Sequence, residues 1–239
     1  MDNIPYLSTD QMVEVDRAMI EDYNILLIQM MENAGRNLAA LARSRFLGGD
    51  PRGRDVVVLV GKGGSGGGGM VCARRLHNWG ASVQVYTTAP VEDFSGVPAH
   101  QLDILKRMGI SVTTEAGPAD THPDLIVDAI IGYSLKGNPR GRAGALISWA
   151  NTSKAPVLSL DVPSGIDTAT GEVHTPAVKA DATMTLALPK NGLRGEAVKA
   201  QVGEAYLADI SVPPALYGNR TLNLGVSAVF AREDIVRLW

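Results

Sequence analysis

Apolar positions along the chain alternate between two kinds of pattern. From residue 8 to residue 46 they recur at spacings of three and four, and Ser8, Thr9 and Asp10 offer caps just before them. This spacing predicts two helices with a break near Asn24. The same periodicity predicts further helices over 70–80, 97–109 and 144–153.

Short apolar runs, many of them β-branched, lie between these helices and are typical of strands buried on both faces. They cover residues 55–61, 82–88, 111–114, 124–132, 155–163 and 180–188, and a late edge strand is predicted over 204–213. Strands that alternate with helices of this size pair in parallel through right-handed crossovers. The pattern therefore predicts an α/β fold, a three-layer αβα sandwich around a mostly parallel central sheet, with residues 1–239 as a single domain.

Composition narrows the class of protein without naming a function. Of the 239 residues, 45% are apolar and 20% are charged, and the net charge of −3 lacks the basic excess that attracts nucleic acid. The single cysteine, Cys72, excludes an intramolecular disulfide and a Cys-rich zinc site. Neither a secretory signal nor a membrane span is visible, so we expect a cytoplasmic protein with no membrane partner. Four histidines without metal-ligand spacing are expected on the surface or partly packed: His77, His100, His122 and His174.

Residues 59–70 read LVGKGGSGGGGM and join the first predicted strand to the next helix. Glycine lets the backbone approach a ligand closely, and a helix N-terminus offers N–H groups to an anion such as phosphate. The segment formally fits G-x-G-x-x-G, but the acidic residue that should bind a ribose about 20 residues later is missing, and no Gly-Lys-Ser/Thr completes a P-loop. A purely structural turn is the alternative; the position at the carboxyl edge of a parallel sheet favours a ligand site.

Two aspartates are predicted at the same edge. Asp128 lies near the end of one strand and Asp161 at the end of the next. A carboxylate in a cleft can act as acid, base or cation ligand, although either residue could instead cap nearby N–H groups. Ser164 follows Asp161 and could join it around a hard cation. Ser134 and Lys136, in the glycine-containing segment after Asp128, suit phosphate or ribose contacts.

Three motifs in order along the chain carry a resemblance: Met-Glu-Asn-Ala-Gly at 31–35, Asp-Ala-Ile-Ile-Gly at 128–132 and Asp-Val-Pro-Ser-Gly at 161–165. With the glycine loop, they resemble the NAD(P)H-hydrate epimerase family, which has the YjeF N-terminal-domain fold, over nearly the whole chain. The resemblance implies one Rossmann-like domain, often dimeric. It also implies an isomerase of metabolite repair, which interconverts the S and R forms of hydrated NADH and NADPH so that a separate dehydratase can restore both.

The resemblance also implies a site across the carboxyl edge, with a potassium ion beside the nucleotide substrate. Ser65, Asp128 and Ser164 would be cation ligands, and Asp128 is also the candidate acid or base. The residues expected to contact the substrate are Gly64, Ser65, Gly66, Gly67, Gly68, Gly132, Tyr133, Ser134, Leu135, Lys136, Gly137, Asn138 and Asp161. The nitrogen lone pair of the hydrate can expel the adjacent hydroxyl once an acid protonates it, and water can return on the other face, so no hydride moves.

The chain departs from the family's loop, which reads Gly-x-Gly-Asn-Asn-Gly-Gly-Asp-Gly. Gly64 and Ser65 replace the two asparagines and Gly68 replaces the aspartate, which predicts a weakened potassium site. Each added glycine also costs about 0.5–1 kcal/mol of ordering entropy relative to alanine. An alternative function is therefore a non-catalytic nucleotide-binding, ADP-ribose-binding or scaffold protein. An NAD(P)-dependent oxidoreductase is disfavoured by the missing ribose-binding acid. The N-terminal helices could pack on the sheet or on a second subunit, and the resemblance favours a homodimer.

Overall fold

The computed structural model describes residues 4–114, 117–118 and 121–239. In this part of the chain eight strands form one sheet in the order β3-β2-β1-β4-β5-β6-β7-β8, and every neighbouring pair is parallel except β7 with β8. The strands are β1 Asp55–Val60, β2 Ser82–Thr87, β3 Ser111–Thr113, β4 Leu125–Ala129, β5 Val157–Leu160, β6 Ala182–Leu186, β7 Glu204–Ala208 and β8 Ile235–Arg237. The predicted α/β fold with a mostly parallel sheet is confirmed.

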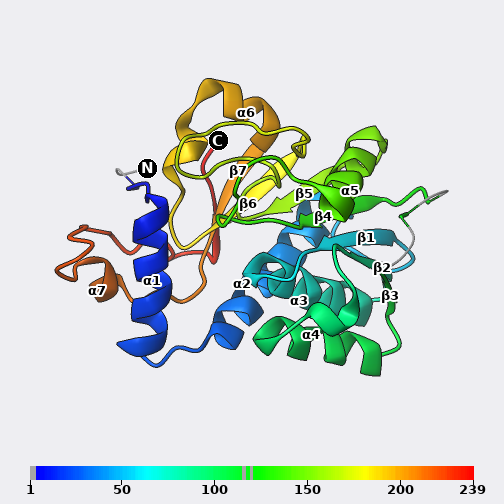
Figure 1. Cartoon of the computed structure of the whole chain (residues 1–239). Coiled ribbons are helices and arrows are strands. Elements are labelled where there is room, and N and C mark those ends of the chain that lie inside the picture. The colour runs from blue at the N-terminus through cyan, green and yellow to red at the C-terminus, as the bar shows by residue number, and fades with distance from the viewer. Residues whose placement is uncertain (1–3, 115–116, 119–120) are drawn as a thin grey trace.

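Helices cover both faces of the sheet, with α3 and α4 below the strands and α5 above them in Figure 1. They are α1 Thr9–Glu21, α2 Leu27–Leu41, α3 Gly64–Asn78, α4 Gly96–Arg107, α5 Gly141–Thr152, α6 Glu196–Val202 and α7 Pro214–Tyr217. Alternate residues of β1 point to opposite faces: Val56, Val58 and Val60 join the core formed with α2, α3 and α4, while Val57 and Leu59 join the core under α5. No helix in the described residues is both long and apolar enough to cross a membrane.

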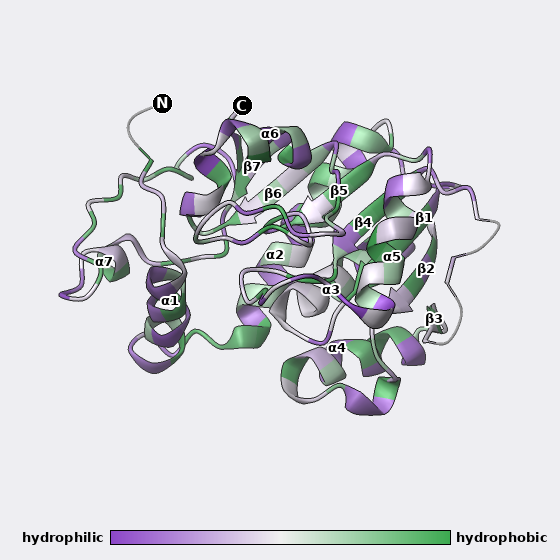
Figure 2. Cartoon of the chain, turned by 45° about the horizontal axis from the view of Figure 1, so that its top comes forward, coloured by the Kyte–Doolittle hydropathy of each residue, from purple (hydrophilic) through white to green (hydrophobic). Residues whose placement is uncertain are grey.

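The N-terminal helices form as predicted, with a break between them. Ser8 caps α1 in a capping box: its hydroxyl accepts the Gln11 N–H at 3.2 Å, and the Gln11 side chain accepts the Ser8 N–H at 2.9 Å. Asn24, at φ 54°, takes the left-handed conformation between α1 and α2. The apolar side of α1 packs within the chain, beside α7 (Figure 1), and Figure 2 shows the polar residues of α1 on its other faces.

The C-terminal edge of the sheet differs from the prediction. The strand predicted over 204–213 is present as β7, but it is not the edge, because β8 pairs with it in antiparallel register with Leu207 opposite Val236. Only three residues long, β8 is too short to show an alternating pattern in the sequence.

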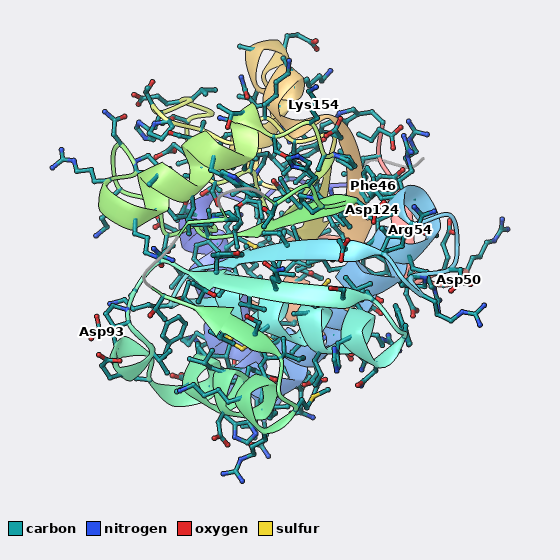
Figure 3. All side chains as sticks on the ribbon, turned by 90° about the vertical axis from the view of Figure 1, so that its right-hand side faces the viewer. Phe46, Asp50, Arg54, Asp93, Asp124 and Lys154 are labelled. Carbon is teal, nitrogen blue, oxygen red and sulfur yellow. The ribbon has the colours of Figure 1, made fainter. Side chains whose placement is uncertain are left out.

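The strand order places a ligand crevice at the carboxyl ends of β1 and β4. From β1 the chain moves outward through β2 and β3, then returns to the other side of β1 as β4. Ligands of open α/β sheets bind where the order reverses in this way. The opposite, amino edge carries an exposed ion pair between Arg54 Nη1 and Asp124 Oδ1 at 3.0 Å; in Figure 3 these two residues lie at the far end of the strands from Asp93, which follows β2.

The glycine run belongs to a helix and not to a long loop. Helix α3 begins at Gly64, six positions before the predicted start at 70, although glycine is a poor helix former. A Cβ on Gly66 would lie 1.8 Å from the Gly61 carbonyl oxygen, and one on Gly69 would lie 2.5 Å from Ala129 Cβ. By contrast, a Cβ on Gly63 or Gly64 would meet nothing within 4 Å. Some of these glycines are therefore demanded by packing, while others leave open space at the helix N-terminus.

This division predicts opposite results for two equal substitutions. Gly66→Ala should lower the free energy of unfolding by about 3 kcal/mol or more, because the added methyl group meets backbone that cannot turn aside. Gly64→Ala should change it by no more than about 1 kcal/mol, in the stabilising direction, because it only restricts the unfolded chain. Urea unfolding of both variants measures the difference, and equal losses would contradict the packing argument.

Candidate ligand-binding site

The first turn of α3 presents backbone donors at the carboxyl end of β1. Gly63 is the N-cap, and its carbonyl oxygen accepts the Gly67 N–H at 3.1 Å. A helix leaves the preceding N–H groups, here those of Gly64, Ser65 and Gly66, without intrahelical acceptors. Together with the positive end of the helix dipole, they form a site suited to an anionic or strongly polar ligand group.

Three predicted site residues from three different strand ends meet beside this turn. A Cβ on Gly132, which follows β4, would lie 2.2 Å from Ser65 Oγ and 3.6 Å from Asp161 Oδ2. Gly132 therefore has to be glycine for Ser65 to approach. This contact brings the hydroxyl of Ser65 and the carboxylate of Asp161 to the same point of the sheet edge.

Asp128 lies just below that point and is completely buried. Ser159 Oγ and the Ser164 N–H donate to its Oδ2, both at 2.8 Å, while Ser164 Oγ at 2.6 Å and the Ile130 N–H at 3.2 Å donate to Oδ1. Burial raises the pKa of Asp128, and the hydrogen bonds from Ser164, Ser159 and Ile130 oppose that shift. No described Lys, Arg or His side chain forms a salt bridge with this carboxylate.

Asp161 is aimed by a tight backbone turn at the end of β5. Its φ of 70° lies in the left-handed region, and the Val162 N–H donates across it to the Leu160 carbonyl at 2.9 Å, as in a strained γ-turn. The side chain is 6% exposed, and its Oδ1 pairs with the ammonium group of Lys190. The described residues donate no hydrogen bond to Oδ2, the oxygen nearest Gly132.

Lys190 is fully buried and was not predicted as a site residue. Besides the pair with Asp161, its Nζ donates to Thr185 Oγ1 at 3.2 Å and to the Leu186 carbonyl at 3.0 Å. A buried ammonium group is tolerated only with such partners. The sequence offered one signal for this residue: Lys190 is the first charged residue after the strand predicted at 180–188.

Asp16, on α1, is a second site residue that the sequence analysis missed. It accepts a hydrogen bond from the Tyr133 hydroxyl at 2.5 Å. Burial raises the pKa of Asp16, and burial together with Asp16 raises that of Tyr133; the charge of Asp161 acts in the same direction on both groups. Asp16 follows Val15 and stands four residues after Met12, at the border of the buried face of α1, and that position was its only sequence signal.

The remaining predicted residues lie around this centre to different extents. A Cβ on Gly67 would point at Met31 and one on Gly68 at Leu160 and Ala34, so both positions face the protein interior. The segment after Tyr133 lies along the rim: Leu135 is half-buried, and Ser134, Lys136, Gly137 and Asn138 are exposed. The four histidines are exposed or half-buried, as predicted, and the described residues contain no group of three or more His, Cys, Asp or Glu side chains that could hold a metal.

A glycine turn at the reversal point of a parallel sheet, with helix donors and two aspartates beside it, defines a Rossmann-like α/β protein that binds a polar ligand at its carboxyl edge. Sequence comparison makes the class specific. Residues 27–192 match the family of the YjeF-related protein N-terminus, and the chain belongs to that family. The resemblance inferred from the sequence motifs is thereby confirmed.

Relatives cover most of the chain. An NAD(P)H-hydrate epimerase of Dehalogenimonas lykanthroporepellens is 42% identical over 86% of this chain and 82% of its own length, and one of Pirellula staleyi is 38% identical over 84% and 90%. A bifunctional NAD(P)H-hydrate repair enzyme of Salinibacter ruber is 36% identical over 88% of this chain, which spans 41% of that protein. The crystal structure of yeast YNL200c has the same fold, with a TM-score of 0.81, 24% identity and coverage of 98% of this chain and 100% of that one.

The buried pair in the site predicts an unequal effect of two lysine substitutions. Lys190→Met should lower the free energy of unfolding by about 3–5 kcal/mol, because it leaves Asp161 buried without its cation. Lys199→Met, which removes a more exposed ion pair with Glu196, should cost no more than about 1 kcal/mol. Urea unfolding at neutral pH compares the two. A loss at position 190 as small as that at 199 would show that the buried pair is not needed.

Proposed function

We propose that this chain interconverts the S and R epimers of hydrated NADH and NADPH, with Asp161 as the group that exchanges protons with the reacting oxygen. The activity itself is that of its family: the relatives with 42% and 38% identity over most of the chain are NAD(P)H-hydrate epimerases, and the chain is an isomerase of this kind. The arrangement of the residues in this chain supports assigning the proton transfer to one side chain, that of Asp161.

The observation that carries the proposal is the asymmetry of the Asp161 carboxylate. Oδ1 is held by Lys190, while Oδ2 lies toward Gly132 and Ser65, where the strand ends meet. A carboxylate fixed at one oxygen and open at the other can accept a proton from an incoming water molecule. The Tyr133 hydroxyl lies near enough for the charge of Asp161 to affect its pKa; its proton is donated to Asp16, so its oxygen faces the site as an acceptor.

Asp128, the candidate acid or base of the sequence analysis, stays a prediction in that role. Its four hydrogen bonds occupy both oxygens, and complete burial keeps it from touching a substrate. We therefore assign it to holding the ends of β4 and β5 together and to cation binding.

The two aspartates can be separated by one kinetic comparison. Asp161→Asn should slow epimerisation by about 10²- to 10⁴-fold, because the proton acceptor is lost while the shape of the side chain is kept. The measurement is chromatography of isolated S and R hydrates after incubation with enzyme in potassium buffer, beside a protein-free control. Asp103→Asn, which makes the same change at an exposed carboxylate on α4, is the matched control. If Asp128→Asn abolishes turnover while Asp161→Asn retains it, the roles are the reverse of those proposed.

The altered glycine loop weakens the case for catalysis less than the sequence alone suggests. Of the three polar side chains missing relative to the family, the one at position 68 would point at the buried side chains of Leu160 and Ala34. Ser65 keeps an oxygen beside Gly132. Only position 64 loses a side chain in open space. The alternative of a non-catalytic ADP-ribose-binding or scaffold protein is therefore disfavoured; such a protein would bind nucleotide in a calorimetric titration without accelerating epimerisation.

The residues around Asp128 fit a potassium ion, which we propose as a ligand of this site. The carboxylate is buried without a positive partner, and the Ser164 hydroxyl, the Ile131 carbonyl and the Ser65 hydroxyl surround the same strand ends. This donor set consists only of oxygen, which hard cations prefer, and a bound ion would replace some of the four hydrogen bonds that Asp128 accepts. When bound, the ion would supply positive charge that offsets the buried carboxylate.

Thermal unfolding tests the ion without depending on turnover. At a potassium concentration about tenfold above the Kd, binding should stabilise the protein by about 1.4 kcal/mol and raise its Tm by about 3–5 °C. Choline chloride at equal ionic strength serves as the control. Asp128→Asn should respond equally to both salts, because the charge that holds the ion is gone. An equal response of the unmodified protein would remove the ion from this proposal.

Two further parts of the proposal concern the binding partners of the protein and its location in the cell. A homodimer is supported by apolar side chains left exposed on and just after α1, namely Val13, Ile20, Tyr23 and Leu26. The bifunctional NAD(P)H-hydrate repair enzymes among the relatives support a partnership with a dehydratase that acts on the same hydrates. A cytoplasmic location is supported by the single cysteine, which is buried and free.

A further inference from the structure

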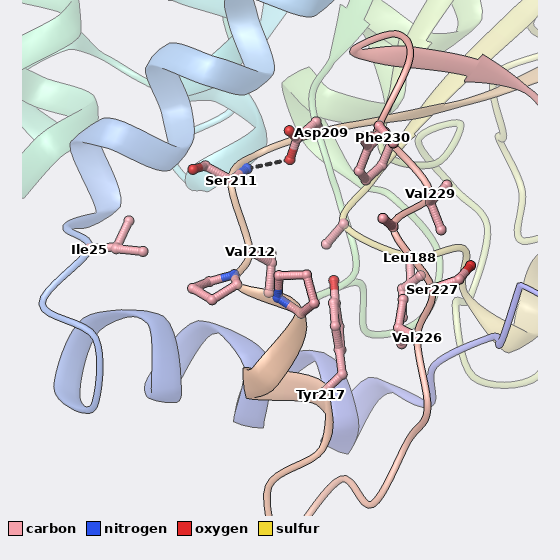
Figure 4. A pocket seen from close by; sticks show the side chains of 15 residues that line it. Ile25, Leu188, Asp209, Ser211, Val212, Tyr217, Val226, Ser227, Val229 and Phe230 are labelled. Carbon is pink, nitrogen blue, oxygen red and sulfur yellow. Dashed lines mark hydrogen bonds between the residues drawn. The ribbon is translucent and has the colours of Figure 1, made fainter.

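A second cavity lies at the carboxyl ends of β6 and β7, apart from the converging residues of the epimerase site. It has a volume of about 360 Å³, within the range of small-molecule sites. Its walls are mainly apolar and come from the segment after β6, the segment after β7 and residues 226–231 (Figure 4). Val212, Leu188, Val226 and Phe230 are among the lining residues. We call this space the Tyr217 cavity.

Tyr217 gives the cavity a polar centre. The residue is 3% exposed, and its hydroxyl has no hydrogen-bond partner among the described residues. Figure 4 shows this hydroxyl aimed into the space between Val212 and Leu188. Burial, together with the charge of Asp209, raises the pKa of Tyr217, so the group stays protonated. A buried donor without an acceptor costs free energy, which a ligand that supplies the acceptor would recover.

Charge around the cavity limits what can enter. Asp209 lines it, with one carboxylate oxygen accepting the Ser211 N–H at 2.6 Å, and neither lysine nor arginine is among the lining residues. An anion placed there would face a like charge without a compensating cation. The phosphates of a nucleotide are therefore unsuited to this cavity, which separates it in ligand chemistry from the glycine turn.

We propose that the Tyr217 cavity is a second ligand site, which takes a small, uncharged, mainly aromatic molecule carrying an amide or similar group. The carbonyl oxygen of such a group accepts from the Tyr217 hydroxyl, its N–H groups suit the Asp209 carboxylate, and its ring fills the apolar space between Val212, Val226 and Phe230.

Two probes of nearly equal shape test the proposal. Binding of 2-naphthamide and 2-naphthoate to the full chain is followed by isothermal titration calorimetry and ligand-observed NMR. The neutral amide should bind saturably, and at least about tenfold more tightly than the carboxylate, because only the carboxylate is repelled by Asp209. Absence of saturable amide binding, or preference for the carboxylate, would overturn the proposal.

Variants locate the probe. Tyr217→Phe, which keeps the ring and removes only the hydroxyl, should weaken amide binding by about threefold to tenfold. Asp209→Asn should reduce the difference in affinity between 2-naphthamide and 2-naphthoate. Val226→Trp, at a half-buried position that packs against the cluster containing Tyr217 and Leu188, should fill the cavity and abolish binding even if Tyr217→Phe folds poorly. Ser65→Ala, in the glycine turn, should leave amide binding unchanged; a loss there would place the probe in the epimerase site and contradict a separate cavity.

Discussion

Helix α3 can begin directly at the end of β1 only because no side chain stands between the two backbones. Gly66 lies against the Gly61 carbonyl, and Gly69 lies against Ala129 of the neighbouring strand. Any Cβ at these positions would push the helix away and withdraw its first N–H groups from the sheet edge. The missing side chains therefore fix the position of the helix dipole, and with it the place where a polar ligand can be held.

Near the N-terminus of α3 the fold gives two neighbouring carboxylates, those of Asp128 and Asp161, different environments. Asp128 is surrounded by hydrogen-bond donors and closed off from solvent, whereas Asp161, itself in the left-handed conformation and also buried, directs one oxygen toward Gly132 and pairs the other with a buried ammonium group. Their strands are adjacent, with Asp128 opposite Ser159, so Asp161 lies two residues further toward the carboxyl edge; this offset, the turn at Asp161 and Lys190 account for the difference. Environments that separate the behaviour of paired acids in this way are a common means of dividing roles in an active site.

Much of this arrangement follows from the sequence, and the exceptions have physical reasons. The alternation of patterns predicts the parallel sheet because burial on both faces forces apolar runs at β1, β4 and β5. It misses the start of α3, because helix propensity opposes four consecutive glycines and only tertiary packing justifies them. It misses Lys190 and Asp16 because their partners, Asp161 and Tyr133, are distant in sequence, and a charged residue becomes informative only when its burial is known. Position 68 is the opposite case. The aspartate that the family has there suggested contact with the ligand, but a Cβ on Gly68 would point at buried side chains.

The segment before the second helix completes a site that the rest of the chain only outlines. Leu7 forms a backbone bridge with Lys190, Thr9 meets Thr168 at 3.2 Å, and Asp16 holds Tyr133. All three contacts come from residues outside the 27–192 stretch by which the family is defined. The stretch that matches the family model is therefore smaller than the site that the structure shows. A fragment limited to residues 27–192 would keep every signature motif. It would nevertheless expose the Lys190 ammonium group to water and remove the hydrogen bond between Tyr133 and Asp16.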